Sequence, residues 1–256
     1  LSFVQRDFYR IFAFGMDNIL EIFLLAVGAS FVQRTTGFGF GIFIMTLLPF
    51  LMPSYGEATT LSGLLALTTS AMISIRMRKY ITWKRLFPIL ITFIIISAAA
   101  ICMLARIHDN TLRKILGIIL MITALYFAFF SRRIKLKTTL PYQIGAGTIS
   151  GIMGGLFGMQ GPPAVLYFIS SEPDKNSYMA MVQTYFLIGN AMMTIVRASN
   201  GFLTATVGRC YVFCIAAVII GSLLGSWAFK HIPGRIFPYV VYSYIGISGL
   251  IIFLTS

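Results

Sequence analysis

The feature that most constrains this chain is the length of its uncharged stretches. An α-helix needs about 20 apolar residues to cross the roughly 30 Å hydrocarbon core of a bilayer. Only 11% of the 256 residues are charged and 58% are hydrophobic, whereas soluble domains contain about 45–50% apolar and about 25% charged residues. The pattern predicts an all-α integral membrane protein with about eight hydrophobic segments and no separate aqueous domain. The stretches without Asp, Glu, Lys or Arg are 35–56, 58–75, 86–105, 115–131, 138–171, 176–196, 210–229 and 236–256.

Positive charge gathers in the short connections between these stretches. The net charge is +13, which in a soluble chain would suggest nucleic-acid binding. Here the basic residues concentrate in loops such as 76–85 and 131–137, and cytoplasmic loops of membrane proteins are enriched in Lys and Arg. We therefore expect both loops to face the cytoplasm, with the lipid bilayer rather than nucleic acid as the partner. Residues 1–18 are predicted to be an N-terminal interfacial segment, with a poorly ordered terminus as the alternative.

Two uncharged regions are too long for one crossing and too short for two. Residues 22–56 carry a single charge, Arg34, and residues 138–171 carry none. A straight helix of either length would extend about 50 Å. Glycine interrupts the first region at 37–41, and glycine with proline interrupts the second at 154–163. Such residues break helical hydrogen bonding, and backbone opened at membrane depth must be buried in protein or line an aqueous cavity. Each region is therefore predicted to be a broken or re-entrant helix.

The two interruptions stand about 120 residues apart, and weaker similarities recur at nearly the same period. We interpret the chain as two membrane repeats, residues 19–130 and 138–256, joined by a basic cytoplasmic linker at 131–137. Paired interruptions at corresponding places in two halves are a sequence sign of a transporter's binding site. The charge distribution fits broken segments that cross the membrane and also re-entrant segments, which would make the halves inverted. Both topologies stay open at this point.

The glycine signatures resemble those of a known family. Residues 37–41 read Gly-Phe-Gly-Phe-Gly and residues 155–163 read Gly-Leu-Phe-Gly-Met-Gln-Gly-Pro-Pro, which is similar to the duplicated signatures of the TauE/SafE sulfite-exporter family. The resemblance covers nearly the whole chain and implies an exporter of sulfite, organosulfonates or related anions in the cell (inner) membrane. This chain departs from the family pattern where Gln160 and Pro162 replace glycines of the second signature, and Phe40 replaces a common glycine of the first.

The charges inside the membrane point to an anionic ligand. All seven carboxylates lie near the N-terminus, at segment ends or in loops, so the intramembrane acid typical of cation pumps and proton relays is missing. Arg34 is the one basic residue inside a long apolar segment. A buried guanidinium is costly unless it is paired, and a bound oxyanion would pair with it. We expect Arg34 to neutralise the substrate; an interfacial position or a pair with Glu57 is the alternative.

Further candidates surround the two interruptions. A helix that restarts there would direct backbone N–H groups toward a cavity, and nearby amides and hydroxyls would give directional hydrogen bonds. No catalytic residue, metal or cofactor is expected. The complete predicted substrate-binding set is Gln33, Arg34, Thr35, Thr36, Gly37, Gly39, Gly41, Gly158, Gln160, Gly161, Gln183 and Asn190.

Other motifs have simpler interpretations. The Gly-x-x-x-Gly spacings at 147–155 and 221–225 favour close helix packing. Residues 246–249 read Gly-Ile-Ser-Gly, a pattern found in intramembrane serine proteases, but that chemistry needs a histidine base deep in another helix. His108 and His231 lie in connections at span ends, so an enzyme is not expected.

The sequence therefore predicts a secondary transporter, and specifically an exporter, of a small sulfur-containing anion that works by alternating access. An anion channel and a carrier of a non-sulfur organic anion are the alternatives, because channels and transporters can share a basic constriction. The expected partners are the small anionic substrate and the lipid bilayer, with a homodimer as one option.

Overall fold

The structure, a computed structural model, describes residues 18–129, 138–172 and 174–231, together with residues 247, 250, 253 and 254. The described residues form helices and no strand. The helices are α2 (Ile19–Thr36), α3 (Phe40–Ile44), α4 (Leu48–Leu51), α5 (Tyr55–Met77), the 3₁₀ helix η1 (Arg78–Tyr80), α6 (Trp83–Leu104), α7 (Asp109–Phe129), α8 (Leu140–Phe157), α9 (Gly161–Ser171), α10 (Lys175–Ser199) and α11 (Ala205–His231).

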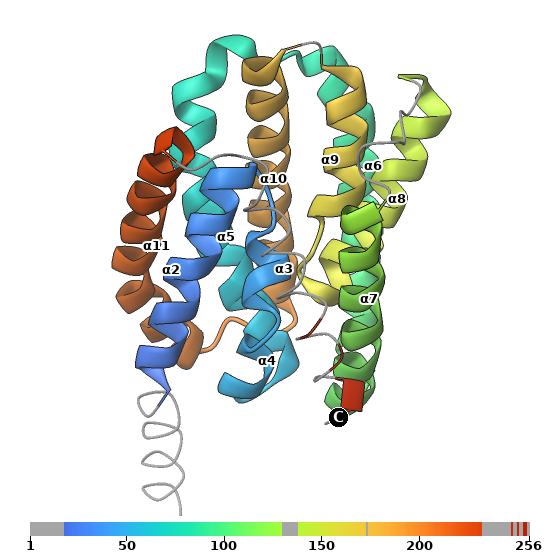
Figure 1. Cartoon of the computed structure of the whole chain (residues 1–256). Coiled ribbons are helices and arrows are strands. Elements are labelled where there is room, and N and C mark those ends of the chain that lie inside the picture. The colour runs from blue at the N-terminus through green and yellow to red at the C-terminus, as the bar shows by residue number, and fades with distance from the viewer. Residues whose placement is uncertain are drawn as a thin grey trace, which may run out of the picture.

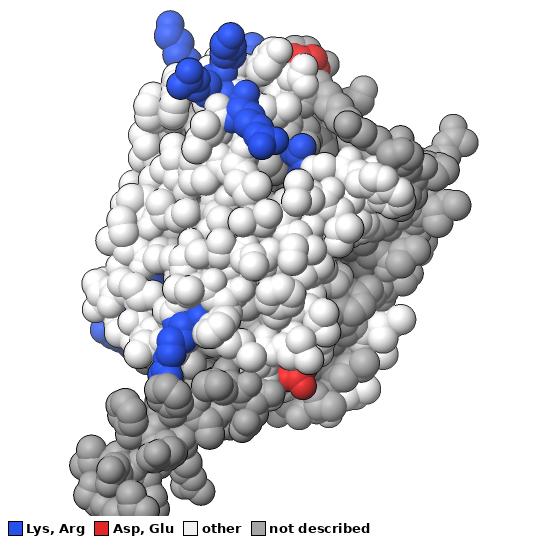
Figure 2. All heavy atoms as spheres, turned by 90° about the vertical axis from the view of Figure 1, so that its left-hand side faces the viewer, with Lys and Arg blue, Asp and Glu red and all other residues white. Residues whose placement is uncertain are grey.

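The surface is that of a membrane protein. Five helices among the described residues, α2, α5 with η1, α6, α10 and α11, are long and apolar enough to cross a bilayer. Large apolar side chains project outward from them, and Leu20, Ile95 and Val212 are each more than 60% exposed. Figure 2 shows a broad band nearly free of charged side chains, with Lys and Arg gathered mostly at one end. This end, uppermost in Figures 1 and 2, carries the exposed basic residues of 76–85.

Both predicted interruptions break the helix. Gly37 ends α2 with φ 87° and Gly39 precedes α3 with φ 96°, a left-handed conformation that glycine adopts without steric cost. Gly158 ends α8 with φ 68°, and α9 then starts with Pro162 and Pro163 in its first turn, where a missing N–H is tolerated.

The broken segments are hairpins that enter from opposite ends of the molecule. In Figure 1, α2 begins at the lower end and the chain returns there through α3 and α4, where α5 begins. The second segment begins at the upper end with α8 and returns there through α9, where α10 begins. Of the two topologies that the sequence leaves open, this path is the re-entrant one.

The remaining packing is pairwise. Helix α2 lies along α11, α6 lies along α8, and α5 lies along α10. The predicted glycine faces are confirmed as packing surfaces: a Cβ at Gly225 would lie 2.8 Å from the Cβ of Arg34 on α2, and one at Gly155 would lie 2.6 Å from the Cβ of Ala100 on α6. Small residues at these positions allow the helix backbones to approach closely.

Several predictions concern residues outside the described ranges. These are the N-terminal interfacial segment up to residue 17, the basic linker at 131–137, the Gly-x-Ser-Gly motif at 246–249, and most of the last span, 236–256. The number of eight hydrophobic segments and the division into two repeats stay predictions.

Candidate functional site

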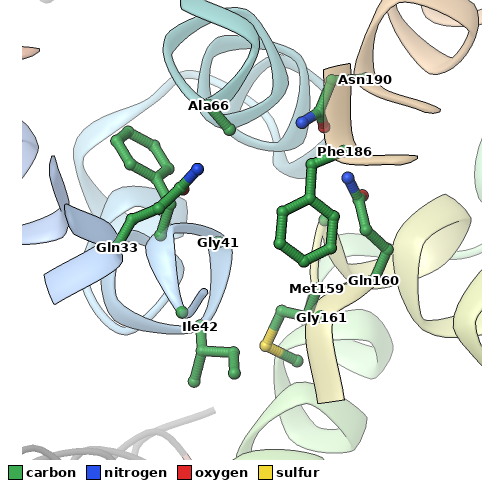
Figure 3. Close-up of a pocket in the computed structure, with 12 residues that line it drawn as sticks. Gln33, Gly41, Ile42, Ala66, Met159, Gln160, Gly161, Phe186 and Asn190 are labelled. Atoms are coloured by element: carbon green, nitrogen blue, oxygen red, sulfur yellow. The ribbon is translucent and has the colours of Figure 1, made fainter. Parts of the chain in front are cut away.

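The two helix breaks meet at a small buried pocket (Figure 3). Its volume is about 20 Å³, the space of about one water molecule. Gln33 reaches it from one side, while Gln160 and Asn190 reach it from the other, with Phe186 between them (Figure 3). The lining residues are Gln33, Gly39, Phe40, Gly41, Ile42, Ala66, Gly158, Met159, Gln160, Gly161, Phe186 and Asn190.

The backbones of the two breaks are in direct contact. A Cβ placed on Gly41 would lie 2.0 Å from the carbonyl oxygen of Gly158, closer than any real side chain could be. The first hairpin can therefore touch the second only because residue 41 has no side chain. The contact joins two segments that are more than 100 residues apart in the sequence.

Seven of the twelve predicted site residues line this pocket: Gln33, Gly39, Gly41, Gly158, Gln160, Gly161 and Asn190. Two more, Gly37 and Gln183, are hydrogen bonded to each other above the pocket: the Gln183 amide donates to the carbonyl of Gly37 at 2.7 Å. Thr35 and Thr36 instead donate to carbonyls of their own helix turn, those of Phe31 and Val32. Their hydroxyls are thus engaged locally, and neither residue lines the pocket.

The structure does not bring Arg34 to the pocket. Its Nε donates to Ser226 Oγ on α11 at 2.7 Å, and its stem packs against Gly225. The reason is the orientation of α2, which turns Gln33 toward the pocket and the next residue toward α11. The alternative pair between Arg34 and Glu57 is also not found: Glu57 accepts a hydrogen bond from Thr204 instead.

Backbone donors around the second break are fewer than expected. The N–H of Met159 already donates to the carbonyl of Met153 at 3.1 Å, and Pro162 and Pro163 have no N–H. The start of α9 therefore cannot provide the full set of N–H groups that a helix N-terminus usually presents. Polar side chains must therefore contribute more than backbone N–H groups to ligand binding at this break.

Above the pocket, the interface between α5 and α10 is closed by paired neutral groups. The Gln33 amide donates to Ser70 Oγ and to Gln183 Oε1, both at 3.1 Å. One turn further up, the hydroxyls of Ser74 and Thr184 are 2.8 Å apart and hydrogen bonded. These bonds satisfy the side chains without any charge.

Below the pocket lies a buried arginine that sequence reasoning missed. Arg197 on α10 is 0% exposed. It donates to the carbonyl of Thr59 at 3.0 Å and to those of Gly154 and Gly155 at 2.9 and 3.3 Å. In the sequence it follows the apolar run 176–196 and resembles an ordinary loop charge.

A polar periodicity could have identified Arg197. It stands seven residues after Asn190 and three after Thr194, so all three lie on one face of α10. The predicted site included Asn190 but did not extend this face by another turn.

Gln160 presents a buried amide to the pocket. Its side-chain oxygen has no hydrogen-bond partner among the described residues, and buried polar groups are normally paired. Ser150 holds the backbone by donating to the Gln160 carbonyl, and the Tyr185 hydroxyl donates to Ser150 Oγ at 2.8 Å. An amide that combines donor and acceptor suits a ligand with both kinds of group, such as water or a protonated oxyanion.

The described residues include no group of three His, Cys, Asp or Glu side chains that could hold a metal ion. The chemistry available at the pocket is therefore hydrogen bonding from amides and opened backbone, next to one buried guanidinium. Such a site is equipped to bind a small polar solute.

Comparison with known proteins agrees with this architecture. Residues 22–252 match the family model described as Sulfite exporter TauE/SafE. The chain is also 22% identical over 206 residues to a probable sulfite/organosulfonate exporter TauE from Cupriavidus necator, an alignment that covers 79% of this chain and 80% of the relative. No solved structure matches the chain significantly. Because the family match extends from α2 beyond α11, this multi-pass membrane protein belongs to the TauE/SafE sulfite exporter family.

Proposed function

We propose that this protein exports a small sulfur-containing oxyanion, such as sulfite or an organosulfonate, across the cell inner membrane. The observation that carries the proposal is the buried polar pocket where two opposed helix breaks meet, in a chain of an exporter family. The basic loop at the upper end favours a cytoplasmic location for that end. The substrate would then enter from above and leave below.

Alternating access is supported by the way the halves pack. Helix α2 begins the first hairpin and lies along α11, which is the second of the long helices that follow the second hairpin. Likewise α8 lies along α6, which has the corresponding place in the first half, and α5 lies along α10. This reciprocal pairing is what two inverted repeats around a central site would produce.

The size of the pocket favours a carrier over the alternative of an open anion channel. A volume of about 20 Å³ holds about one water molecule, so a sulfonate group cannot be accommodated until the hairpins separate. A channel would instead need a continuous hydrated path. Counterflow-stimulated uptake is the behaviour expected of the carrier, and a linear current–voltage relation is that of the channel.

The test is transport by purified protein in liposomes. We expect uptake of radiolabelled sulfite or sulfoacetate that is stimulated by unlabelled substrate on the opposite side. Gln160→Leu should lower this uptake at least tenfold, because it removes the amide from the pocket. Gly208→Ala is the matched control, since a Cβ at Gly208 meets nothing within 4 Å.

A thermal-shift series with sulfite, sulfate, sulfoacetate, taurine and simple carboxylates would define the substrate class. Stabilisation by sulfur oxyanions and not by carboxylates supports the proposal. Stabilisation by carboxylates alone would replace it with the carrier of a non-sulfur organic anion. Absence of counterflow for every anion in the series would remove the proposal.

A further inference from the structure

We propose that Arg197 forms a second anion-binding site below the pocket, between α5 and α10, through which the transported oxyanion leaves. This inference rests on the proposed function and assigns it a path and a charged residue. It distinguishes the lower half of the α5–α10 interface from the upper half, where neutral side chains are paired with one another.

Arg197 carries a buried charge that no described carboxylate compensates. The Arg197 guanidinium is fully buried, and within the described part of the chain it donates to neutral backbone carbonyls. No carboxylate of the described residues forms an ion pair with it. Uncompensated charge in a membrane interior is costly and marks sites of function. An oxyanion beside Arg197 would provide the missing negative charge.

Four buried polar atoms on α5 and α10 have no hydrogen-bond partner among the described residues. They are Arg197 Nε, Thr194 Oγ1, Ser62 Oγ and Tyr55 Oη. Each comes from α5 or α10, the helices on either side of the lower interface. Because buried polar atoms are normally paired with protein or water, this group indicates a place for a polar guest. Three of the four atoms are hydroxyls, which can donate to an oxyanion.

Gly63 lies close both to the pocket lining and to the Arg197 guanidinium. A Cβ placed on Gly63 would lie 3.2 Å from Arg197 Nη1, 3.7 Å from Thr194 Oγ1 and 3.9 Å from Asn190 Oδ1. Asn190 lines the pocket, so Gly63 lies between the pocket wall and the guanidinium. Since glycine presents no side chain there, an anion can pass from Asn190 to Arg197 once the helices separate slightly.

The test measures the charge preference of a cysteine at the proposed site. Cys102, Cys210 and Cys214 are first replaced by Ser or Ala, and Thr194→Cys is introduced into the full chain. In liposomes, the anionic sulfonate MTSES and the cationic MTSET are applied separately from the non-cytoplasmic side. We expect MTSES to modify the cysteine at least ten times faster than MTSET, because the guanidinium attracts the sulfonate. Methanesulfonate should slow the reaction with MTSES.

Three matched variants isolate the contribution of Arg197. Arg197→Met should abolish the tenfold preference, whereas Arg197→Lys should retain most of it because the charge remains. Ser199→Cys, at the exposed end of the same helix, should show little preference. If Arg197→Met does not assemble, the protection by methanesulfonate and the Arg197→Lys variant still decide the question.

Equal rates for the two reagents, or no reaction of either reagent at Thr194→Cys while Ser199→Cys reacts, would overturn the inference. Both results would leave sulfite counterflow by the unmodified protein as a separate measurement. Failure of counterflow alone would remove the proposed function, so the two failures are distinguishable.

Discussion

Side chains donate hydrogen bonds to backbone carbonyls at both helix breaks, but the donor is neutral at one break and charged at the other. At the first break, the Gln183 amide donates to the freed carbonyl of Gly37. At the second, the Arg197 guanidinium donates to the carbonyls of Gly154 and Gly155. Both donors come from α10, which thus contacts both breaks. The first break is stabilised by a neutral group and the second by a cation, so the electric field across the pocket is asymmetric.

The asymmetry bears on direction. The polar side chains of the upper α5–α10 interface are neutral and hydrogen bonded to one another, so they do not attract an anion. The positive charge of Arg197 in the lower interface does. As a general scale, two opposite unit charges about 8 Å apart attract each other by about 2 kcal/mol at an effective dielectric constant of 20. An energy of that size is sufficient to bias the side to which the pocket opens with substrate bound.

The largest effect is expected from Gly41→Ala. Its methyl group would overlap the carbonyl oxygen of Gly158, so the hairpins must separate. Overpacking in a well-packed core costs about 1–3 kcal/mol and sometimes more. We expect transport to be lost and the midpoint of thermal unfolding in detergent to fall. Gly145→Ala, where a Cβ meets nothing within 4 Å, should retain both; unchanged transport by Gly41→Ala would show that the breaks do not need to touch.

The second effect is expected from removing the neutral donor at the first break. Gln183→Leu leaves the Gly37 carbonyl and the Gln33 amide without one partner each, which costs about 1–3 kcal/mol of stability. Transport should fall because the upper part of the α5–α10 interface loses the hydrogen bonds of Gln183 to Gln33 and Gly37. Gln143→Leu is the control: it removes a buried amide that donates to Tyr167 at 2.7 Å, away from both breaks. Equal transport losses in the two variants would mean that the hydrogen bond from Gln183 to the Gly37 carbonyl has no special role in transport.

A smaller effect is expected from Arg34→Met. This change removes the hydrogen bond to Ser226 and about 1 kcal/mol of stability, but it leaves the pocket lining intact. The apparent affinity for sulfite, measured by counterflow at graded concentrations, should stay within about twofold of the unmodified value. A tenfold loss of affinity would return Arg34 to the binding site and weaken the contrast between a neutral and a positive break.

The smallest effect concerns the outer end of the second hairpin. Burial raises the pKa of the Glu172 carboxyl above its usual value, and the nearby Arg85 partly offsets this; the two side chains are 3.6 Å apart. Because the folded-state pKa is raised, the stability contribution of Glu172 is fully present below the ordinary value of 4.5 and is lost as the pH rises through the folded-state value.

Arg85→Met should therefore destabilise the protein more at pH 7 than at pH 4, since it removes the partner of the charged form. Arg85 is half exposed, so the difference should be about 0.5 kcal/mol, measured as the change in unfolding midpoint between the two pH values. Lys84→Met, an exposed neighbour, should show no such pH dependence. A larger loss at pH 4 would contradict the assigned direction.

The sequence was most informative where backbone chemistry decides the structure. Glycine with positive φ and the Pro162–Pro163 pair mark both breaks, and these properties belong to the residues themselves. The glycine spacings on α8 and α11 likewise predicted where helices approach closely. Seven of the twelve candidate residues line the pocket, and six of them lie in or beside the breaks; the seventh, Asn190, lies on α10.

The sequence was least informative about which helix face meets which neighbour. Arg34 and Gln33 are adjacent in the chain, yet only Gln33 lines the pocket, because the pairing of α2 with α11 directs Arg34 away. Arg197 was missed for the complementary reason. It stands at the end of an apolar run, where most arginines reach water, and only the approach of α5 and α8 makes it buried. The polar face of α10 that Arg197 shares with Asn190 and Thr194 is a periodic signal, but it does not reveal which helices cover that face.

The small volume of the pocket also bears on the electrical insulation of the cell. At about 20 Å³ the pocket holds about one water molecule, so a sodium ion entering it would have to lose its hydration shell. The membrane potential is worth about 2.3 kcal/mol per charge at 100 mV. A carrier that rested in this conformation would limit the dissipation of that potential through the pocket.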